Sequence, residues 1–431
     1  MAHLTARQGY EQLVQRLNRA PQGAPPSQLL FEILALLFSE KEAELVARLP
    51  ILPFTADKAA KAWGIGVPEA EGLLQRLADK GLLVDIRIKG SMEYVLPPPM
   101  AGFFEFAMMR VRSDVDQKLL SELYEQYITV EEDFIKALFM GGKTQVGRVF
   151  VQEAVLSSEQ ALHVLDFQKA TEVIETATDI GIGLCYCRHK RAHQGRACKA
   201  EMDNCMTFNM AASSLIRHGI VRRVDKSECR EMLHQAYEQN LVQFGENIQK
   251  GVNFICNCCP CCCEAMLAAR RFGIMSPVHT SGFLPHVEET CTGCGRCLPT
   301  CPLGVLSLET KGDKGLGEKR AVVDHARCLG CGVCSRNCPR ESLRMKRGAG
   351  RIITPVNGTH RAVLMAIERG KLQNLIVDNQ VLHSHRALAA VLGVILGLPP
   401  VKRALAGEQI GSRFLGAMCE RYERKWFPEE P

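Results

Sequence analysis

The chain has 431 residues, enough for about three domains of ordinary size; 46% are hydrophobic and 23% are charged. This composition excludes a disordered, collagen-like or mucin-like chain. The formal net charge of +6, from 53 basic and 47 acidic residues, is mild for this length. It does not by itself indicate a protein that binds nucleic acid, for which a concentrated basic face is expected.

The 20 cysteines are the unusual feature of the composition, because nineteen of them lie between Cys185 and Cys338. A disulfide-stabilised secreted protein is usually short, with cysteines spread through small loop-rich domains. The first twenty residues contain no apolar segment typical of a secretory signal, and the longest apolar stretch, Ala387–Leu398, has twelve residues. A bilayer span needs about 20. We therefore expect a cytoplasmic protein without a transmembrane segment, whose thiols bind metal.

The N-terminal part of the chain is predicted to be helical up to a small hairpin. Residues 1–27 form an amphipathic helix that ends in a Pro-rich linker. Residues 28–100 contain, in order, helices at Leu29–Phe38, Ala56–Trp63 and Pro68–Lys80 and a hairpin of Leu82–Ile88 and Met92–Leu96. This order resembles a winged helix-turn-helix module, which implies DNA binding by the third helix.

Charge argues against DNA binding by this winged-helix-like module. The third helix carries three acidic and two basic residues, and residues 51–100 have no net charge. A phosphate-binding face requires several Lys and Arg side chains. We therefore regard nucleic acid as an unfavoured partner and expect a docking module instead.

The next two parts are a helical linker region at 101–154 and a Cys-rich domain at 155–280, which we also call the middle domain. In the linker, Asp114 is the expected N-cap of a helix whose core stripe is Leu119, Leu120, Leu123 and Tyr127. In the Cys-rich domain, short apolar strands alternate with helices near 168–178, 206–218 and 227–240, which suggests an α/β domain. The expected strands are Leu162–Leu165, Gly183–Tyr186, Ile220–Val224 and Val252–Ile255.

Two runs of cysteines are the strongest motif in the sequence. Each run has the spacing C-x2-C-x2-C-x3-C-P, and 26 residues separate them. The first run is Cys291, Cys294, Cys297 and Cys301, and the second is Cys328, Cys331, Cys334 and Cys338. Structural zinc sites prefer paired C-x2-C motifs separated by a longer gap, so this spacing favours iron.

These runs resemble the bacterial-type ferredoxins that carry two [4Fe-4S] clusters, over about 60 residues within 281–347. The resemblance implies a dicluster ferredoxin-type domain in which each run supplies three ligands to one cluster and its fourth cysteine to the other. One cluster is thus expected at Cys291, Cys294, Cys297 and Cys338. The other is expected at Cys328, Cys331, Cys334 and Cys301. Every iron then has a thiolate, so the clusters are expected to transfer electrons rather than to catalyse.

Ten further cysteines form a candidate third metal site in the Cys-rich domain. They are Cys185, Cys187, Cys198, Cys205, Cys256, Cys258, Cys259, Cys261, Cys262 and Cys263. The ten fall into two sets in the sequence, four from Cys185 to Cys205 and six from Cys256 to Cys263. Each set begins where an expected strand ends, so we expect the two strand ends to be neighbours that share one site. The alternatives are a further iron–sulfur cluster, a zinc site with His189 or His193, and a redox-active dithiol.

Five basic residues accompany these cysteines in the sequence: Arg188, Lys190, Arg191, Arg196 and Lys199. They are interpreted as a surface patch that lowers thiol pKa values or docks an acidic redox partner. Cys229 and Cys419 are interpreted as ordinary thiols.

Taken together, the sequence predicts an α+β multidomain iron–sulfur protein with a helical C-terminal region at 348–431. It would relay electrons to redox partner proteins, or act as the electron-carrying subunit of an oxidoreductase. A G-x-G-x-x-G dinucleotide motif is absent. Two alternatives remain: a redox-sensing DNA-binding regulator, and a reductase with catalysis at the middle-domain cysteines. No oligomeric state is indicated.

Overall fold

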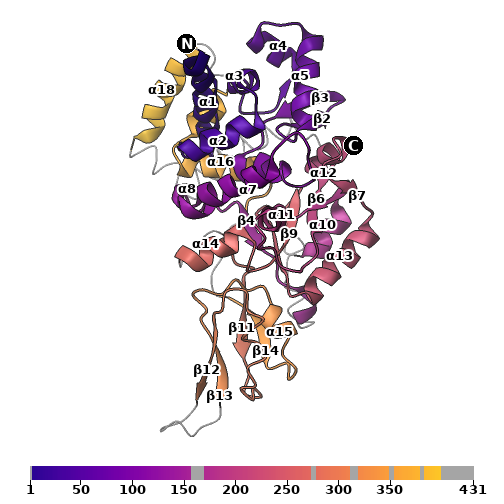
Figure 1. The fold of residues 1–431 in the computed structure, drawn as a ribbon. Helices are drawn as coiled ribbons and strands as arrows, with labels where there is room; N and C mark the ends of the chain where they lie inside the picture. The colour runs from indigo at the N-terminus through magenta and orange to yellow at the C-terminus, as the bar shows by residue number, and fades with distance from the viewer. Residues whose placement is uncertain are drawn as a thin grey trace. The chain divides into compact units, whose positions relative to one another are not determined.

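The structure is a computed structural model that describes residues 2–156, 169–272, 278–310, 319–348, 354–378 and 383–398 (Figure 1). It mixes helices with several sheets, which confirms the prediction of an α+β protein. The chain forms two compact units. The first comprises Met1–Thr144, Ser213–Arg222 and Val356–Pro431, and the second comprises Gln145–Ala212 and Arg223–Pro355.

The first unit is mainly helical and contains one three-stranded sheet of order β1-β3-β2. Its elements are α1 (Ala2–Arg19), α2 (Gln28–Leu37), α3 (Glu40–Ala47), β1 (Phe54–Thr55), α4 (Ala56–Trp63), α5 (Val67–Asp79), β2 (Val84–Ile88), β3 (Ser91–Val95), the turn η1 (Pro99–Phe103), α6 (Phe104–Phe106), α7 (Gln117–Tyr124), the π-helical turn η2 (Glu125–Val130), α8 (Asp133–Met140), α16 (Gly358–Glu368), α17 (Leu372–Ile376) and α18 (His383–Gly397).

Local sequence signals explain where the elements of residues 28–100 begin and end. The hydroxyl of Ser27 accepts from the backbone N–H of Leu30 and starts α2, and Ser39 forms a capping box with Glu42 at the start of α3. Helix α3 is absent from the predicted order, whereas the other three helices and the hairpin lie close to their expected positions. Lys89 and Gly90 both have positive φ, as the two-residue turn joining β2 and β3 requires.

The helical linker region differs from its prediction at the N-cap. The backbone N–H of Leu119 donates to Asp116 at 2.9 Å, so Asp116 caps α7. Asp114, the predicted cap, instead accepts from the guanidinium of Arg112. Leu120 and Tyr127 are buried as predicted, but Leu119 is 42% exposed.

A buried polar cluster fastens residues 213–222 to the β2–β3 hairpin within the first unit. The carboxylate of Asp85 on β2 accepts from the hydroxyl of Ser214 at 2.6 Å and from the guanidinium of Arg217 at 2.9 Å. The His218 ring lies between Asp85, 3.2 Å from Nε2, and Asp79, 2.6 Å from Nδ1. Burial acts to lower the pKa of His218, but the hydrogen bonds to both carboxylates outweigh burial and raise it.

The second unit contains a seven-stranded sheet of order β10-β4-β8-β9-β6-β5-β7 and two small antiparallel pairs, β11 with β14 and β12 with β13. Its elements are β4 (Gly147–Val149), the 3-10 turn η3 (Glu153–Val155), α10 (Ala170–Thr176), β5 (Ile180–Leu184), α11 (Tyr186–His193), β6 (Asp203–Phe208), α13 (Lys226–Glu238), β8 (Val242–Glu246), β9 (Phe254–Cys258), α14 (Glu264–Phe272), β10 (Val278–His279), β11 (Phe283–Val287), β12 (Leu306–Thr310), β13 (Lys319–Val323), α15 (Val333–Arg336) and β14 (Leu343–Arg347). Helix α12 (Asn209–Arg217) and strand β7 (Arg222–Arg223) cross the division between the units.

The large sheet departs from the predicted α/β arrangement in its strand directions. Strands β5, β6, β9, β8 and β4 pair antiparallel along the sheet, and β10 pairs parallel with β4. Helices and strands alternate along the sequence, but alternation alone does not decide whether neighbouring strands run parallel. The predicted strand Leu162–Leu165 lies outside the described residues.

A single apolar core holds helices α10 and α13 against this sheet. Ile174 and Leu233 from the helices pack with Ile182 and Phe208 from β5 and β6. Cys229 lies in the same core, fully buried, and burial raises the pKa of its thiol to about 12. Its surroundings agree with the prediction of an ordinary thiol, while Cys419 lies outside the described residues.

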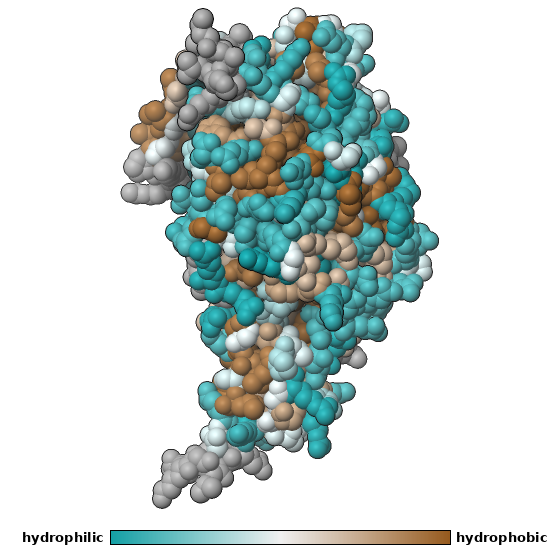
Figure 2. All heavy atoms as spheres, viewed as in Figure 1, coloured by the Kyte–Doolittle hydropathy of each residue, from teal (hydrophilic) through white to brown (hydrophobic). Residues whose placement is uncertain are grey.

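The described part of the C-terminal region is helical, as predicted. Helix α18 exposes several large apolar side chains, seen as brown atoms at the left of Figure 2; they are Leu388, Val391, Val394 and Ile395. No helix within the described ranges is long and apolar enough to cross a membrane.

We expect His218 to make the first unit's stability depend on pH. A raised folded-state pKa means that the stabilisation is complete below the unfolded pKa of about 6.5 and is lost as pH rises through the folded pKa. His218→Asn should therefore lower the free energy of unfolding by about 2 kcal/mol at pH 6 and by much less at pH 9. The measurement is urea unfolding followed by Trp63 fluorescence in a Trp426→Phe background. A deficit that is the same at both pH values would contradict this assignment.

Candidate metal centres

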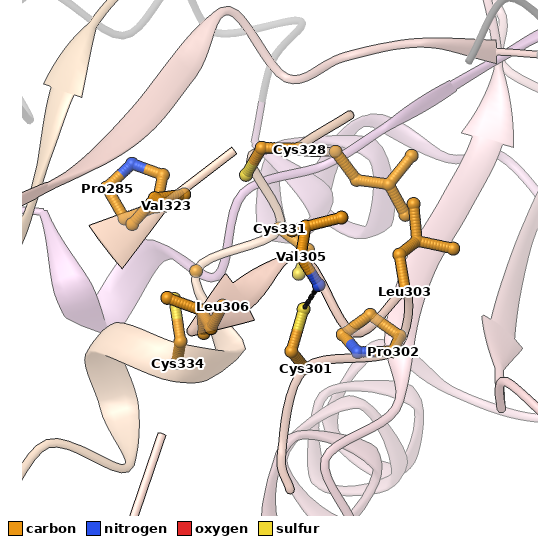
Figure 3. A pocket seen from close by; sticks show the side chains of 12 residues that line it. Pro285, Cys301, Pro302, Leu303, Val305, Leu306, Val323, Cys328, Cys331 and Cys334 are labelled. Carbon is orange, nitrogen blue, oxygen red and sulfur yellow. Dashed lines mark hydrogen bonds between the residues drawn. The ribbon is translucent and has the colours of Figure 1, made fainter. Parts of the chain in front are cut away.

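The fourth cysteine of the first run lies with the first three cysteines of the second run. Cys301, Cys328, Cys331 and Cys334 line one hollow, whose other walls include Pro285, Leu303 and Val323 (Figure 3). The thiol of Cys301 accepts from the backbone N–H of Val305 at 3.4 Å. Such N–H···S hydrogen bonds stabilise sulfur that carries negative charge.

The matching hollow joins the first three cysteines of the first run to the last cysteine of the second. It is lined by Cys291, Cys294, Cys297 and Cys338, with Gly293, Arg296, Pro339 and Arg340 among its other residues. Cys294 is exposed, whereas the three second-run cysteines of the other hollow are buried. The two hollows therefore differ in their access to solvent.

The donor set and the apolar walls fit an iron–sulfur cluster in each hollow. Burial raises the pKa of Cys328 to about 11 and that of Cys331 to about 12, and it raises that of Cys334 well above its usual range. Three thiolates in such surroundings need a compensating positive charge, which cluster iron supplies. The protein alone provides four thiols and few charges at this position.

Glycine is required where the cysteine loops pass close to other backbone. Gly330 has φ +70°, and a Cβ atom there would lie 2.0 Å from the carbonyl oxygen of Phe283. Gly293 has φ +63°, and its Cβ would lie 2.2 Å from the carbonyl oxygen of Lys319. Only glycine permits this combination of φ and close approach, so these two residues hold the loops against β11 and β13.

The cysteines of the middle domain gather at one edge of the seven-stranded sheet. Strands β5 and β9 both pair antiparallel with β6, so β5 and β9 run in the same direction and end at the same edge. Cys185 follows β5, and Cys256 and Cys258 end β9. Cys205 on β6 lies directly opposite Cys256. The two strand ends lie near each other, as predicted, because β5 and β9 end on the same side of the sheet with β6 between them.

Six of these ten cysteines form a continuous set of hydrogen-bonded thiols, the six-cysteine group. Contacts with the thiols of Cys187 and Cys258 lower the pKa of Cys263, and contacts with the thiols of Cys205 and Cys258 lower the pKa of Cys256. Cys187 also contacts Cys185. The members of the group are Cys185, Cys187, Cys205, Cys256, Cys258 and Cys263.

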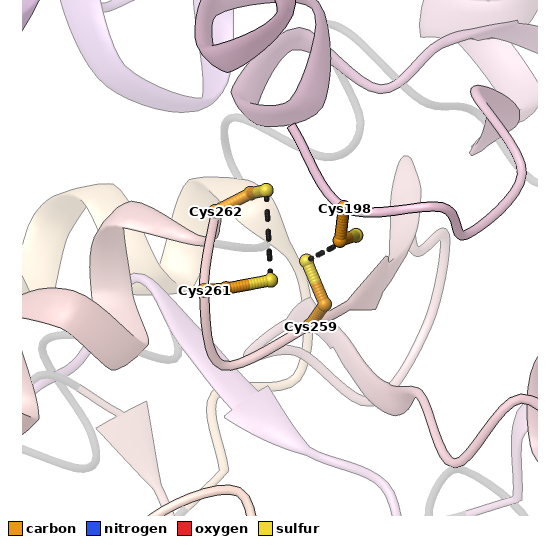
Figure 4. Close-up of side chains that lie close together, drawn as sticks. All are labelled: Cys198, Cys259, Cys261 and Cys262. Carbon is orange, nitrogen blue, oxygen red and sulfur yellow. Dashed lines mark hydrogen bonds between the residues drawn. The ribbon is translucent and has the colours of Figure 1, made fainter. Parts of the chain in front are cut away.

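The other four cysteines form a separate four-cysteine group, Cys198, Cys259, Cys261 and Cys262 (Figure 4). Their Sγ atoms all lie within 4.8 Å of one another. The hydrogen bond from Cys262 has the largest effect on the pKa of Cys259. Together with the positive charge of Arg188, it lowers this pKa to about 5. The structure therefore brings the ten cysteines together in two groups, not around one point.

The predicted surface patch of basic residues is largely inside the protein. Arg188 and Lys190 are fully buried and Arg191 is nearly so, whereas Arg196 and Lys199 are exposed. A docking surface made of all five residues is therefore excluded. Their sequence spacing does not reveal this, because α11 turns most of its basic side chains inward.

Arg188 is a buried charged residue that interacts with thiols of both cysteine groups. Its guanidinium donates to Asn204 at 2.8 Å and to the carbonyl of Asn257 at 2.7 Å, which fixes its position. Burial acts to lower the pKa of Arg188, but the Cys185 and Cys259 thiolates outweigh burial and raise it. Its fixed positive charge therefore stabilises thiolates in both groups. The sequence did not point to Asn204 or Asn257, because nothing in it distinguishes them from other polar residues.

The two candidate histidine ligands face each other. Nε2 of His189 lies 3.2 Å from Nε2 of His193, and the four-cysteine group contains no histidine. The alternative of a zinc site that includes His189 or His193 is therefore not supported by the geometry.

Comparison with known proteins supports the interpretation of the two cysteine runs. Residues 290–342 match the family model of the 4Fe-4S dicluster domain, and this segment holds all eight cysteines of the runs. Neither a curated protein nor a solved structure matches the chain. The family match and the grouped cysteines of the middle domain together indicate an iron–sulfur electron-transfer protein, whose ferredoxin-type domain implies redox partners.

The position of Cys301 predicts an exchange of ligands between the runs. Cys301→Ser should disturb the cluster bound mainly by the second run, because Cys301 lines that hollow. The double variant Cys301→Ser/Cys328→Ser should lose no more cluster signal than Cys301→Ser alone, since both residues serve one cluster. The double variant Cys301→Ser/Cys291→Ser should lose the signals of both clusters. Electron paramagnetic resonance of the dithionite-reduced protein measures this. If Cys301→Ser with Cys291→Ser removed one cluster alone, the exchange would be wrong.

Proposed function

We propose that this protein relays electrons between a redox partner and a metal centre in its middle domain, through two [4Fe-4S] clusters. In this assignment one cluster is held by Cys291, Cys294, Cys297 and Cys338. The second is held by Cys301, Cys328, Cys331 and Cys334. A further cluster is held by four of the six cysteines of the six-cysteine group. When bound, the clusters supply one-electron chemistry, and the protein supplies their positions and surroundings.

The observation that carries the proposal is one apolar cluster shared by the middle domain and the second-run hollow. Cys258 and Cys263 of the six-cysteine group pack in it together with Cys328 and Cys331. Val242 and Val333 lie in the same cluster and are fully buried. Electron transfer requires metal centres that lie close together, and a continuous dry contact between their ligands provides this.

A second apolar cluster supports the connection between the two ferredoxin-type clusters. Cys297 and Cys334 are buried in it, and Cys301 and Cys338 pack against it. Cysteines from both hollows thus belong to one packed region. The three centres would form a linear order: first-run cluster, second-run cluster, middle-domain cluster.

Hydrogen bonds fix the ferredoxin-type region to the middle domain within the second unit. The backbone N–H of Gln152 donates to the carbonyl of Cys331 at 3.1 Å. Asn240, which precedes β8, accepts from Arg336 at 2.8 Å and from Asn337 at 2.7 Å. These bonds hold the ligand loops at fixed positions relative to the middle-domain sheet, which keeps the separation of the centres constant.

Solvent exposure favours the first-run cluster as the point of exchange with a partner. Cys294, Arg296 and Arg340 are exposed at its hollow, whereas the cysteines shared with the middle domain are buried. A partner protein would therefore reach the first-run cluster directly and the others only through it. The exposed arginines favour an acidic partner surface.

The surplus of thiols in the six-cysteine group favours a reductase as the second candidate function. A cubane cluster uses four thiolates, so two of the six would remain as thiols beside it. A thiol pair beside an electron source is the arrangement that disulfide reduction needs. In that case the same relay would deliver electrons to chemistry at this group.

The metal content tests the relay. We expect about twelve irons and matching acid-labile sulfide per chain after purification without oxygen, because three cubane clusters hold four irons each. The triple variant Cys256→Ser/Cys258→Ser/Cys263→Ser leaves three of the six thiols, too few for a cubane cluster, so it should retain about eight irons and the reduced spectrum of the two ferredoxin-type clusters. Cys229→Ser, a buried thiol outside the groups, is the matched control and should retain about twelve. About eight irons in the unsubstituted protein would refute the middle-domain cluster.

We infer that the winged-helix-like module at 28–100 docks protein and does not bind DNA. The exposed face of α5 carries three acidic residues, Glu69, Glu71 and Asp79, and one basic residue, Arg76. Lys80, which follows α5, is paired with Glu42 at 2.7 Å. This face repels phosphate, so the redox-sensing DNA-binding regulator is the less favoured function.

Fluorescence anisotropy with a labelled DNA duplex tests this inference. At about 0.15 M salt, we expect no binding tighter than the non-specific range of about 10⁻⁴ to 10⁻⁶ M, in the oxidised or the reduced protein. A tighter complex whose affinity changed with cluster oxidation state would favour the regulator.

A further inference from the structure

The spacing of the sulfur atoms in the four-cysteine group matches a single metal ion. Sγ of Cys198 lies 3.6 Å from Sγ of Cys259, and Sγ of Cys261 lies 3.7 Å from Sγ of Cys262. Four sulfurs about 2.3 Å from one tetrahedral zinc ion lie about 3.8 Å from one another. In a four-iron cluster each cysteine binds a different iron, so the sulfurs are farther apart. The observed spacing therefore favours one shared ion.

The chain segment that carries three of the four thiols is short and tightly turned. Cys259, Cys261 and Cys262 occupy the turn between β9 and α14, and the backbone N–H of Cys263 closes it by donating to the carbonyl of Cys259 at 3.2 Å. Pro260 restricts the turn further. Adjacent thiols on so tight a turn are well placed to share one ion.

The fourth thiol comes from a separate part of the sequence. Cys198 lies on the loop between α11 and β6, and it approaches the turn from the opposite side in Figure 4. Its side chain packs against the apolar cluster that contains Cys259 and Cys262. A metal ion at this point would bind the loop to the turn.

Charge and burial also suit a four-thiolate ion. Zinc with four thiolates carries a net charge of −2, and the fixed guanidinium of Arg188 lies beside Cys259 and Cys198. Cys262 is fully buried while Cys261 is exposed, so one side of the group is open for entry of the ion. All four positions are filled by protein, which is the pattern of structural rather than catalytic zinc.

We propose that Cys198, Cys259, Cys261 and Cys262 bind one structural zinc ion, distinct from the three clusters of the proposed relay. Zinc is favoured over ferrous iron because thiolate sites bind Zn²⁺ more tightly than Fe²⁺. The ion fastens the loop that follows α11, the helix of Cys187, to the turn that ends at Cys263; both cysteines belong to the six-cysteine group. This site does not depend on the relay, since the zinc and the iron are counted separately.

Elemental analysis with a sulfide assay on the full-length protein tests the site. The unsubstituted protein should contain about one zinc per chain, and Cys198→Ser/Cys261→Ser should lose it while keeping its iron and sulfide. Cys256→Ser/Cys258→Ser/Cys263→Ser should show the reverse, with zinc retained and about four of the twelve irons lost. Cys229→Ser should keep all three. If Cys198→Ser/Cys261→Ser lost iron instead, or if the unsubstituted protein held no zinc, the proposal would be overturned.

A second measurement needs no variant and so does not depend on a variant folding. X-ray absorption at the zinc edge of the unsubstituted protein should show four sulfur ligands at about 2.3 Å. Nitrogen or oxygen in the zinc shell would overturn the four-cysteine site. A normal iron count with no zinc would refute the zinc site alone, whereas a low iron count with one zinc would refute the middle-domain cluster alone.

Discussion

The second unit depends on how negative charge on sulfur is balanced inside the protein. Its two hollows and two thiol groups bring eighteen cysteines together, of which eight are buried, eight are half-buried and two are exposed. A buried thiolate is unstable without nearby positive charge, and the raised pKa of Cys331 records that cost. Metal ions supply the charge and displace the protons, so folding and metal binding are linked in this unit.

The two halves of the unit balance this charge differently. In the middle domain, Arg188 interacts with thiols of both groups, and the buried Lys190 pairs with Glu264, the residue after Cys263. Around the second-run hollow the walls are apolar, and no lysine or arginine is among the residues that line it. The metal must therefore contribute nearly all the balancing charge there. In the middle domain the protein contributes part of it.

The sequence alone predicted the elements that depend on local interactions. The β2–β3 hairpin and the spacing of the cysteine runs each depend on a few neighbouring residues, so their consequences can be read directly. The predicted cap Asp114 was wrong, because Asp116 two residues later caps α7. The division of the ten middle-domain cysteines into two groups could not be read in this way. It depends on β6 lying antiparallel between β5 and β9, and strand direction is decided by contacts between distant segments.

Polar residues that become buried were the other failure of the sequence-based predictions. Arg188, Lys190 and Arg191 were assigned to a surface, because charged residues are rarely buried without partners. Their partners come from far along the chain, as Asn257 does for Arg188. Asp85 and His218 are separated in the same way, and neither carries a local signal of their contact.

The exchange of Cys338 into the hollow of the first run has a consequence for synthesis of the protein. Cys291, Cys294 and Cys297 leave the ribosome before any residue of the second run, yet their hollow is completed by Cys338. At about 5 to 20 residues per second, the residues after Cys297 take about 2 to 8 s to reach Cys338. In the proposed assignment, the cluster whose ligands are made first is therefore the last of the two that can be finished. Until then its three thiols depend on the cell to keep them reduced.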